Sequence, residues 1–284
     1  MITVLESINL SAKYLSEKGI DSARINAELL LADILKCKRL DLYLLFDRPL
    51  SDSELQLYRE YLKRRANYEP LQYIVGKVEF YGLEFIVNRS VLIPRPETEL
   101  LVENIINRHK EENKLSILDI GCGSGCISVA LAVNLNSAKV ISTDVCNDSL
   151  IIARANAQKY ELESKIKFRV HDILTQSLNE FEMFDIIVSN PPYVSAGNYY
   201  TLQREILEFE PRIAVTDEND GLTFYKAITE KSINKLKTGG QLYFEIADGQ
   251  AEQVIKLMKQ HNFTNIEAIK DYQDIYRIVC GEIK

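Results

Sequence analysis

The stretch Ile117-Leu118-Asp119-Ile120-Gly121-Cys122-Gly123-Ser124-Gly125 decides the fold of this 284-residue chain. Its first four residues are typical of a buried strand, and a helix is expected over residues 125–134. Glycines in the turn between them allow a tight bend and the close approach of a ligand to bare backbone. The start of the helix offers unpaired N–H groups. The stretch therefore predicts a ligand site where a strand ends.

The spacing of the glycines separates two classes of ligand. Dinucleotide sites use G-x-G-x-x-G to pack a pyrophosphate on the helix start. Here the third glycine, Gly125, arrives one residue early, and Asp119 before the turn disfavours a phosphate. A carboxylate there suits the cationic amino acid end of S-adenosylmethionine better. We therefore expect residues 121–125 to bind S-adenosylmethionine, and a Rossmann dehydrogenase is the weaker hypothesis.

The chain after this turn continues to alternate between strands and helices, which predicts an α/β fold with a mostly parallel sheet covered on both faces. The first strand is residues 116–120. The other expected strands are 139–143, 166–170, 184–189, 240–246 and 275–280, and the helices are 98–108, 125–134, 147–160, 221–236 and 249–260.

The region before the sheet has a different character. Residues 1–70 show apolar residues at helical spacing, and we expect a small helical bundle there. Ser51 followed by Glu54 has the pattern of a capping box at the start of one of its helices. Aromatic and β-branched residues then alternate around two glycines, which predicts a β-hairpin linker over residues 71–93. The third part, residues 94–284, carries the α/β pattern.

Two further strand ends carry candidate cofactor contacts. Asp144 follows the second strand, where a carboxylate can accept hydrogen bonds from both ribose hydroxyls; the alternative is that the glycines only make a turn and Asp144 caps the next helix. After the third strand, Ile173 could pack on the adenine ring and Asp172 could reach its exocyclic amine. For Asp172 a role as a loop cap is equally open.

The fourth strand ends in Asn190-Pro191-Pro192-Tyr193, and this tetrapeptide points to the chemistry. The lone pair of an amide nitrogen is delocalised, so its planar NH2 group must be aimed at the methyl donor. The Asn190 side-chain oxygen and the Pro191 carbonyl could accept its two N–H bonds. The two prolines stiffen the loop, and Tyr193 could pack on the planar group. Positioning alone would drive the reaction, without a strong base.

Composition argues against several classes of function. The net charge of −7 argues against nucleic acid as the main partner. The cluster Lys63-Arg64-Arg65 is a local exception, either a solvated helix face or a contact to a partner. The five cysteines lack the spacing of a zinc site and suit free thiols of a reducing compartment. No apolar run is long enough to span a bilayer, so we expect a cytoplasmic protein.

Taken together, these motifs resemble the release factor glutamine methyltransferases, the PrmC/HemK family. The glycine turn, Asp144 and residues 190–193 are similar to class I amino-methyltransferases in general. The narrower resemblance covers essentially the whole chain and lies in these segments: Ala23-Arg24 with Ala27 to Leu30, Pro70 to Gly76, Leu92 to Glu99, Glu208-x-Glu210-Pro211, Asp220-Gly221-Leu222, Gly239-Gly240, Glu245-Ile246, Gln250, and Lys270-Asp271 with Arg277.

The resemblance implies a Rossmann-like class I methyltransferase domain with a seven-stranded sheet, preceded by a helical domain that helps bind the substrate. It implies N5-methylation of the glutamine in the Gly-Gly-Gln motif of class 1 peptide-chain release factors, with S-adenosylhomocysteine as the second product. Cofactor contacts are implied at residues 121–125, Asp144, Ile173 and Asn190. Substrate contacts are implied at residues 190–193. Residues 94–98 would lie beside the cofactor or form an interdomain turn.

Two positions depart from the family pattern: Ala247 stands where glycine is expected, and Ile173 where an aromatic residue is frequent. The main alternative is an adenine-N6 nucleic-acid methyltransferase acting on a flipped base. It should carry a basic groove or a target-recognition domain, which the balanced charge of the first eighty residues does not favour. A non-catalytic module that kept the fold would show damage to the turn or the tetrapeptide. We expect a monomer with no metal.

Overall fold

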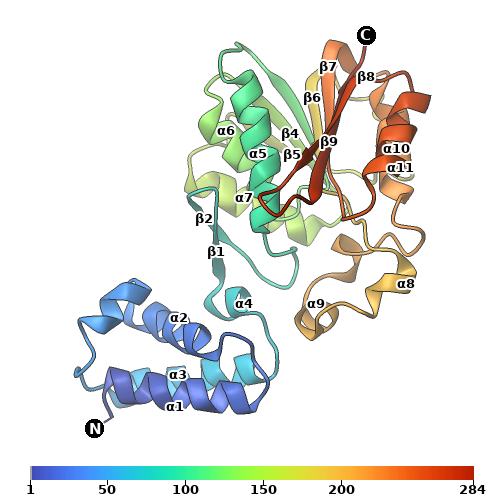
Figure 1. Ribbon diagram of the computed structural model, residues 1–284. Helices are drawn as coiled ribbons and strands as arrows, with labels where there is room; N and C mark the ends of the chain where they lie inside the picture. The colour runs from blue at the N-terminus through green and yellow to red at the C-terminus, as the bar shows by residue number, and fades with distance from the viewer. Residues whose placement is uncertain (1) are drawn as a thin grey trace. The chain divides into compact units, whose positions relative to one another are not determined.

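The computed structural model describes residues 2–284, and the chain forms two compact units. One unit comprises the residues up to 77 together with 203–209. The other comprises residues 78–202 and 210–284. Both are drawn in Figure 1, and each is described separately below.

The first unit is a helical bundle around an apolar core. Ser51 Oγ accepts a hydrogen bond from the backbone N–H of Glu54 at 3.3 Å, and the Glu54 carboxylate accepts one from the backbone N–H of Ser51 at 2.8 Å, so the predicted capping box is confirmed. Leu15, Leu30 and Leu31 are fully buried in the core. The helices are α1 (Val4–Glu17), α2 (Ala23–Leu35), a 3₁₀ helix (Arg39–Tyr43), α3 (Asp52–Ala66), α4 (Leu71–Val75) and α9 (Arg204–Phe209).

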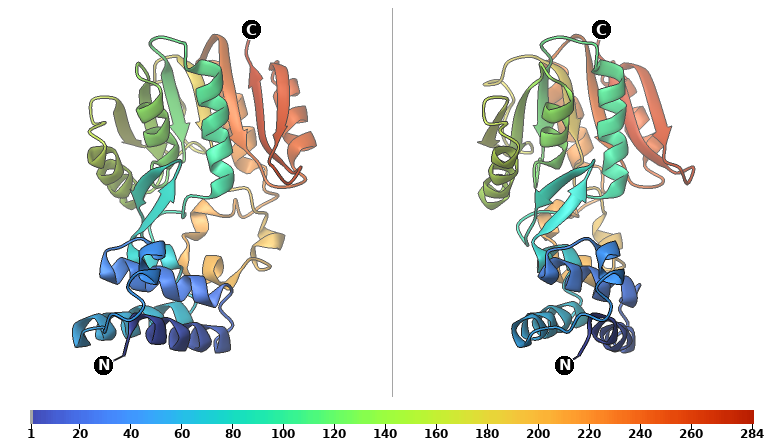
Figure 2. Two further views of the ribbon diagram at one scale, coloured as in Figure 1. Left: turned by 60° about the vertical axis from the view of Figure 1, so that its left-hand side comes forward. Right: turned by 90° about the vertical axis from the view of Figure 1, so that its left-hand side faces the viewer.

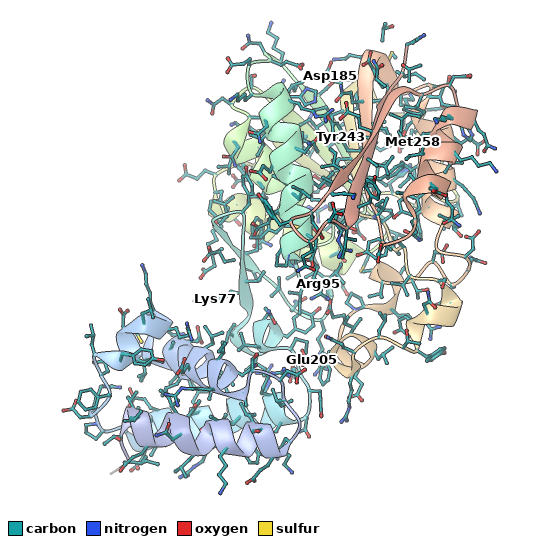
Figure 3. The ribbon with its side chains drawn as sticks, viewed as in Figure 1. Lys77, Arg95, Asp185, Glu205, Tyr243 and Met258 are labelled. Atoms are coloured by element: carbon teal, nitrogen blue, oxygen red, sulfur yellow. The ribbon has the colours of Figure 1, made fainter. Side chains whose placement is uncertain are left out.

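Helix α9 joins this bundle from a distant part of the sequence. The buried Arg65 of α3 forms an ion pair with Glu205 of α9 at 2.5 Å, and the Arg204 guanidinium lies 4.4 Å from the centre of the Tyr68 ring. Glu205 is labelled in Figure 3. The sequence pattern gave no sign of this association. Helix α9 is short and lies far from the bundle in the sequence, so no local pattern indicates its partner.

The linker differs from the hairpin expected over residues 71–93. Its first part is helix α4, which begins after Pro70 and ends at Gly76, where φ is +78°. The hairpin is shorter and consists of β1 (Lys77–Phe80) and β2 (Leu83–Ile86). The fully buried Asn156 holds β2 in place, since its side chain exchanges hydrogen bonds with the backbone of Ile86 at 2.7 and 3.0 Å.

The second unit is built on a seven-stranded sheet, which confirms the predicted fold class. The order is β5-β4-β3-β6-β7-β9-β8; the first five strands are parallel, and β9 runs antiparallel to both β7 and β8. The strands are β3 (Ser116–Ile120), β4 (Lys139–Asp144), β5 (Ile166–Val170), β6 (Phe184–Ser189), β7 (Leu236–Glu245), β8 (Thr264–Lys270) and β9 (Tyr276–Glu282).

Helices cover both faces of the sheet, as the alternating pattern predicted (Figures 1 and 2). One face carries α5 (Pro96–His109), α6 (Cys126–Asn134) and α7 (Asn147–Lys159); the other carries α10 (Thr223–Ser232) and α11 (Ala251–Gln260). Strand β8 was absent from the predicted strand ranges. It is one of the two edge strands, and all of its side chains are partly or fully exposed, so it lacks the apolar run that marks the central strands.

Gly125 connects the sheet to α6 in a conformation that few other residues adopt. Its φ is +77°, and an added Cβ would lie 3.1 Å from the Cβ of Ala153. We predict that Gly125→Ala lowers the free energy of unfolding by about 1–3 kcal/mol, because it combines backbone strain with a close contact. Gly197→Ala is the matched control, since a Cβ there meets nothing within 4 Å. Equal midpoints for both variants in urea denaturation would refute the assignment.

Candidate functional site

A cavity of about 560 Å³ lies within the second unit at the carboxyl ends of the central strands. Strand β3 pairs with β4 on one side and with β6 on the other, so the residues that follow these strands are neighbours. The order in which successive strands are added reverses here, because β4 and β5 lie on one side of β3 and β6 and β7 on the other. Open α/β sheets bind their ligands at such a point. Candidate residues that line the cavity are Gly121, Gly123, Asp144, Asp172, Ile173, Asn190, Pro191 and Pro192.

The glycine turn presents two of its five residues to the cavity. Gly121 and Gly123 have φ of +75° and +53°, and no atom lies within 4 Å of a Cβ built on either, so the turn leaves open space for a ligand. The other three face away from the cavity lining. Cys122 packs against Leu150 and Ala153, Ser124 is buried, and Gly125 begins the helix.

Asp144 holds the turn in position. Its two carboxylate oxygens accept hydrogen bonds from the backbone N–H groups of Gly123 and Cys146, both at 2.9 Å. Burial raises the pKa of Asp144. Helix α7 begins at Asn147, its N-cap residue is Cys146, and the Cys146 side chain makes no capping hydrogen bond. Both hydrogen bonds to Asp144 come from residues before Asn147, so Asp144 does not cap the first turn of α7. A carboxylate so placed faces the cavity while bonded on both oxygens to backbone.

Asp119 lies beneath the turn and outside the cavity lining. Its side chain is completely buried; Oδ2 accepts a hydrogen bond from Ser128 Oγ at 2.5 Å, and Oδ1 has no partner among the described residues. Burial raises the pKa of Asp119 to about 7. A buried carboxylate with an unpaired oxygen adds negative potential under the turn, which suits a cationic ligand above it.

Asp172 and Ile173 line the same cavity near the end of β5. The Asp172 carboxylate accepts hydrogen bonds from Leu174 N at 2.9 Å and Thr175 Oγ1 at 2.7 Å, so it has the geometry of a loop cap. Ile173 is buried against Phe181 and Leu178, which leaves an apolar wall on that side of the cavity.

The tetrapeptide follows β6 directly. Asn190, Pro191 and Pro192 line the cavity, whereas Tyr193 packs partly into the core beside β7. Gln250 supports the loop, because its amide donates to the Tyr193 carbonyl at 3.1 Å and to the Gly221 carbonyl at 3.2 Å. Gly221 comes so close that an added Cβ would lie 2.5 Å from the Tyr193 carbonyl oxygen, which explains a glycine at this position.

Behind the tetrapeptide, Thr98 and Glu245 form a polar cluster with Asn190 and Tyr193. Asn190 Nδ2 donates to Thr98 Oγ1 at 3.1 Å, and Tyr193 Oη donates to Glu245 Oε1 at 3.5 Å. Glu245 is fully buried, and its Oε2 accepts no hydrogen bond from the described residues. Burial raises the pKa of Glu245 to about 7, although hydrogen bonding from Thr98 opposes this.

Several lining residues were also missed. They come from two segments without regular periodicity, Ser90 to Leu92 and residues 211–218. Glu210 joins these segments, since its carboxylate pairs with the Arg95 guanidinium and accepts a hydrogen bond from Ile93 N at 3.2 Å. The pattern Glu208-x-Glu210-Pro211 was the available signal. Residues 94–98 do not line the cavity themselves.

No helix within residues 2–284 is long and apolar enough to cross a membrane. In the same range, no three or more histidine, cysteine, aspartate or glutamate side chains gather as a metal site would require.

The seven-stranded sheet with a cavity at the ends of β3, β4 and β6 defines a class I methyltransferase. The family model "Methyltransferase small domain" matches residues 96–279, and "PrmC N-terminal domain" matches residues 6–76. The release factor glutamine methyltransferase of Geobacter sulfurreducens is 39% identical over 99% of this chain and 97% of its own length. That of Chlorobaculum tepidum is 38% identical over 97% and 95%. The chain belongs to the release factor glutamine methyltransferase family and is an S-adenosylmethionine-dependent enzyme.

Solved structures agree on the fold. The catalytic domain of hMettl16, solved with an RNA hairpin, has a TM-score of 0.57 at 16% identity and covers 82% of this chain and 83% of that one. The 16S rRNA N2 G1207 methyltransferase of Thermus thermophilus, solved with AdoMet and guanosine, has a TM-score of 0.50 at 18% identity and covers 73% and 50%. At these identities the likeness concerns the fold alone.

The buried carboxylate of Asp119 predicts a pH-dependent stability difference. Because the pKa of Asp119 is raised in the folded protein, to about 7 from an ordinary 3.8, the folded state loses stability relative to a neutral side chain as pH rises through this window. Asp119→Asn keeps an acceptor for Ser128. We expect it to be more stable than the parent at pH 8, by roughly 2–4 kcal/mol, and similar at pH 4.

Chemical denaturation of the cofactor-free proteins at both pH values measures this difference. Asp148→Asn, on the exposed side of α7, is the control. A stability difference between Asp119→Asn and the parent that stays constant with pH would contradict the burial argument.

Proposed function

We propose that this protein transfers the methyl group of S-adenosylmethionine to the side-chain amide nitrogen of the glutamine in the Gly-Gly-Gln motif of class 1 peptide-chain release factors. One observation carries the proposal: Asn190, Pro191 and Pro192 line the same cavity as Gly121, Gly123 and Asp144. The names of the full-length relatives supply the substrate class. S-adenosylhomocysteine is the second product.

The cofactor side of the cavity fits the expected ligand. Bound S-adenosylmethionine supplies an electrophilic methyl group. The open backbone of Gly121 and Gly123 gives space for its amino acid end, and the carboxylate of Asp119 lies beneath in support of its positive charge. Asp144 accepts hydrogen bonds from the ribose, Ile173 packs against the adenine, and Asp172 orders the loop beside it. Cys122, Ser124 and Gly125 act through the shape of the turn.

The tetrapeptide holds the substrate amide. Asn190 Oδ1 and the Pro191 carbonyl accept its two N–H bonds, so that the face of the nitrogen points toward the methyl donor. Pro192 stiffens the loop and Tyr193 supports it from the core. The proton leaves after the methyl group has transferred, so no strong base is required. The gain in rate comes from preorganised acceptors.

The helical unit serves in this proposal as a docking domain for the release factor, with residues 1–70 as its main part, 71–93 as the linker and 94–284 as the catalytic domain. We place the reaction in the cytoplasm and treat the enzyme as a monomer. We assign it no sequence-specific contact with nucleic acid, because the net charge is −7.

The decisive test incubates the full chain and S-adenosylmethionine with a class 1 release factor or, in parallel, with an adenine-containing DNA duplex. We expect one methyl group on the Gly-Gly-Gln glutamine by peptide mapping, and none on DNA. Asn190→Ala should reduce the transfer by at least a hundredfold while the thermal midpoint persists, since an acceptor of the substrate amide is lost. Methylated DNA with an unmodified release factor would overturn the proposal.

The assignment of Asp144 has its own test. Asp144→Ala should weaken S-adenosylmethionine binding by about 1.5–3 kcal/mol, because hydrogen bonds to a charged group are lost. Isothermal titration calorimetry measures the change. Asp148→Ala, which removes an exposed carboxylate from the first turn of α7, is the matched control. Equal affinities for the two variants would exclude a ribose contact by Asp144.

A further inference from the structure

The buried polar cluster behind the tetrapeptide has a direction that the mechanism above does not explain. An asparagine amide has an oxygen on one side and an NH2 group on the other, and the two are nearly the same size. Only one orientation gives an acceptor to a substrate N–H. Some neighbour of Asn190 must therefore distinguish its oxygen from its nitrogen.

Thr98 contacts Asn190 but cannot make this distinction alone. A hydroxyl group both donates and accepts, so Thr98 Oγ1, 3.1 Å from Asn190 Nδ2, could bond either side of the amide. The distinction comes from where the hydroxyl proton goes. If Thr98 donates elsewhere, its oxygen is left to accept, and Asn190 must turn its NH2 group toward Thr98.

Glu245 can take this proton, because its Oε2 is buried and accepts no other hydrogen bond from the described residues. It lies fully buried at the end of β7, and its carboxylate faces Thr98, Asn190 and the Tyr193 hydroxyl. An ionised carboxylate only accepts hydrogen bonds. Burial, above all, and the charge of Glu97 raise the pKa of Glu245, whereas hydrogen bonding from Thr98 and Asn190 and the charge of Arg277 lower it. Above neutral pH the carboxylate is therefore the fixed end of the chain of hydrogen bonds.

We propose that Thr98 and Glu245 are positioning residues that set the orientation of the Asn190 side-chain amide. Glu245 accepts from the Thr98 hydroxyl, Thr98 accepts from Asn190 Nδ2, and Asn190 Oδ1 is thereby directed to the substrate. The inference rests on the proposed function, since it specifies how an amide-bearing substrate is held. It predicts that an isosteric change at Thr98 or Glu245, neither of which touches the substrate, alters the turnover rate.

The kinetic test uses the full chain well above neutral pH. Thr98→Val removes the hydroxyl at nearly constant volume and should lower kcat roughly ten- to hundredfold, with unchanged KM for the release factor and unchanged cofactor affinity. Thr98→Ser should recover most of this rate. Glu245→Gln can donate to Thr98 and so reverse the chain; it should lower kcat to a similar extent. The control is Thr229→Val, a buried threonine of α10 whose hydroxyl has no partner among the described residues.

A second measurement does not depend on the substrate. The side-chain NH2 signals of Asn190 in a ¹⁵N-correlated NMR spectrum, identified by their loss in Asn190→Asp, report its hydrogen bonding directly. They should shift in Thr98→Val and Glu245→Gln, and stay in place in Thr98→Ser and Thr229→Val. Unchanged signals in Thr98→Val, or equal rates for the valine and serine variants, overturn the inference. An unmodified release factor with the parent enzyme refutes the proposed function instead, and the NMR result then decides the inference alone.

Discussion

The parallel pairing of β3 with β4 on one side and β6 on the other is the constraint on which the site depends. It brings the carboxyl ends of three strands together, with Ile120 opposite Thr143 and Asp119 opposite Val188. The glycine turn, Asp144 and the tetrapeptide lie at these three ends, and Asp172 and Ile173 follow β5, the strand paired with β4. Strands β4 and β6 lie on opposite sides of β3, so the helices that connect them to the rest of the sheet cover opposite faces. An opening is left between these helices at the ends of the strands.

The same arrangement makes the site costly for the fold. Asp119 and Glu245 are completely buried carboxylates, and each has one oxygen without a protein partner among the described residues. Ionising such groups in a poorly hydrated interior opposes folding. They are tolerated because the strands on which they lie are held by pairing on both sides and by apolar layers on both faces. Strands held in this way can keep a polar group where a less constrained segment would turn it to solvent.

The sequence was sufficient for the elements whose signal is local. The glycine turn, Asp144 and the tetrapeptide each follow a short apolar strand, and parallel topology alone brings such ends together. The parts that were missed depend on distant contacts. The edge strand β8 shows only half-buried alternation, α4 replaces part of an expected hairpin, and α9 joins the helical bundle through Arg65 and Glu205. The cavity-lining residues 211–218 lack a period and are placed by contacts such as that between Glu210 and Arg95.

The orientation of Asn190 belongs to this second kind of property. The tetrapeptide provides the amide, but its direction depends on Thr98 at the start of α5 and on Glu245 at the end of β7. These residues come from three elements separated by more than fifty positions in the chain. A four-residue motif can therefore indicate that an NH2 group is bound, while the polarity of the acceptor that binds it is set by tertiary structure. This explains why Thr98 and Glu245, which lie outside the cavity lining, have a place in the chemistry of the site.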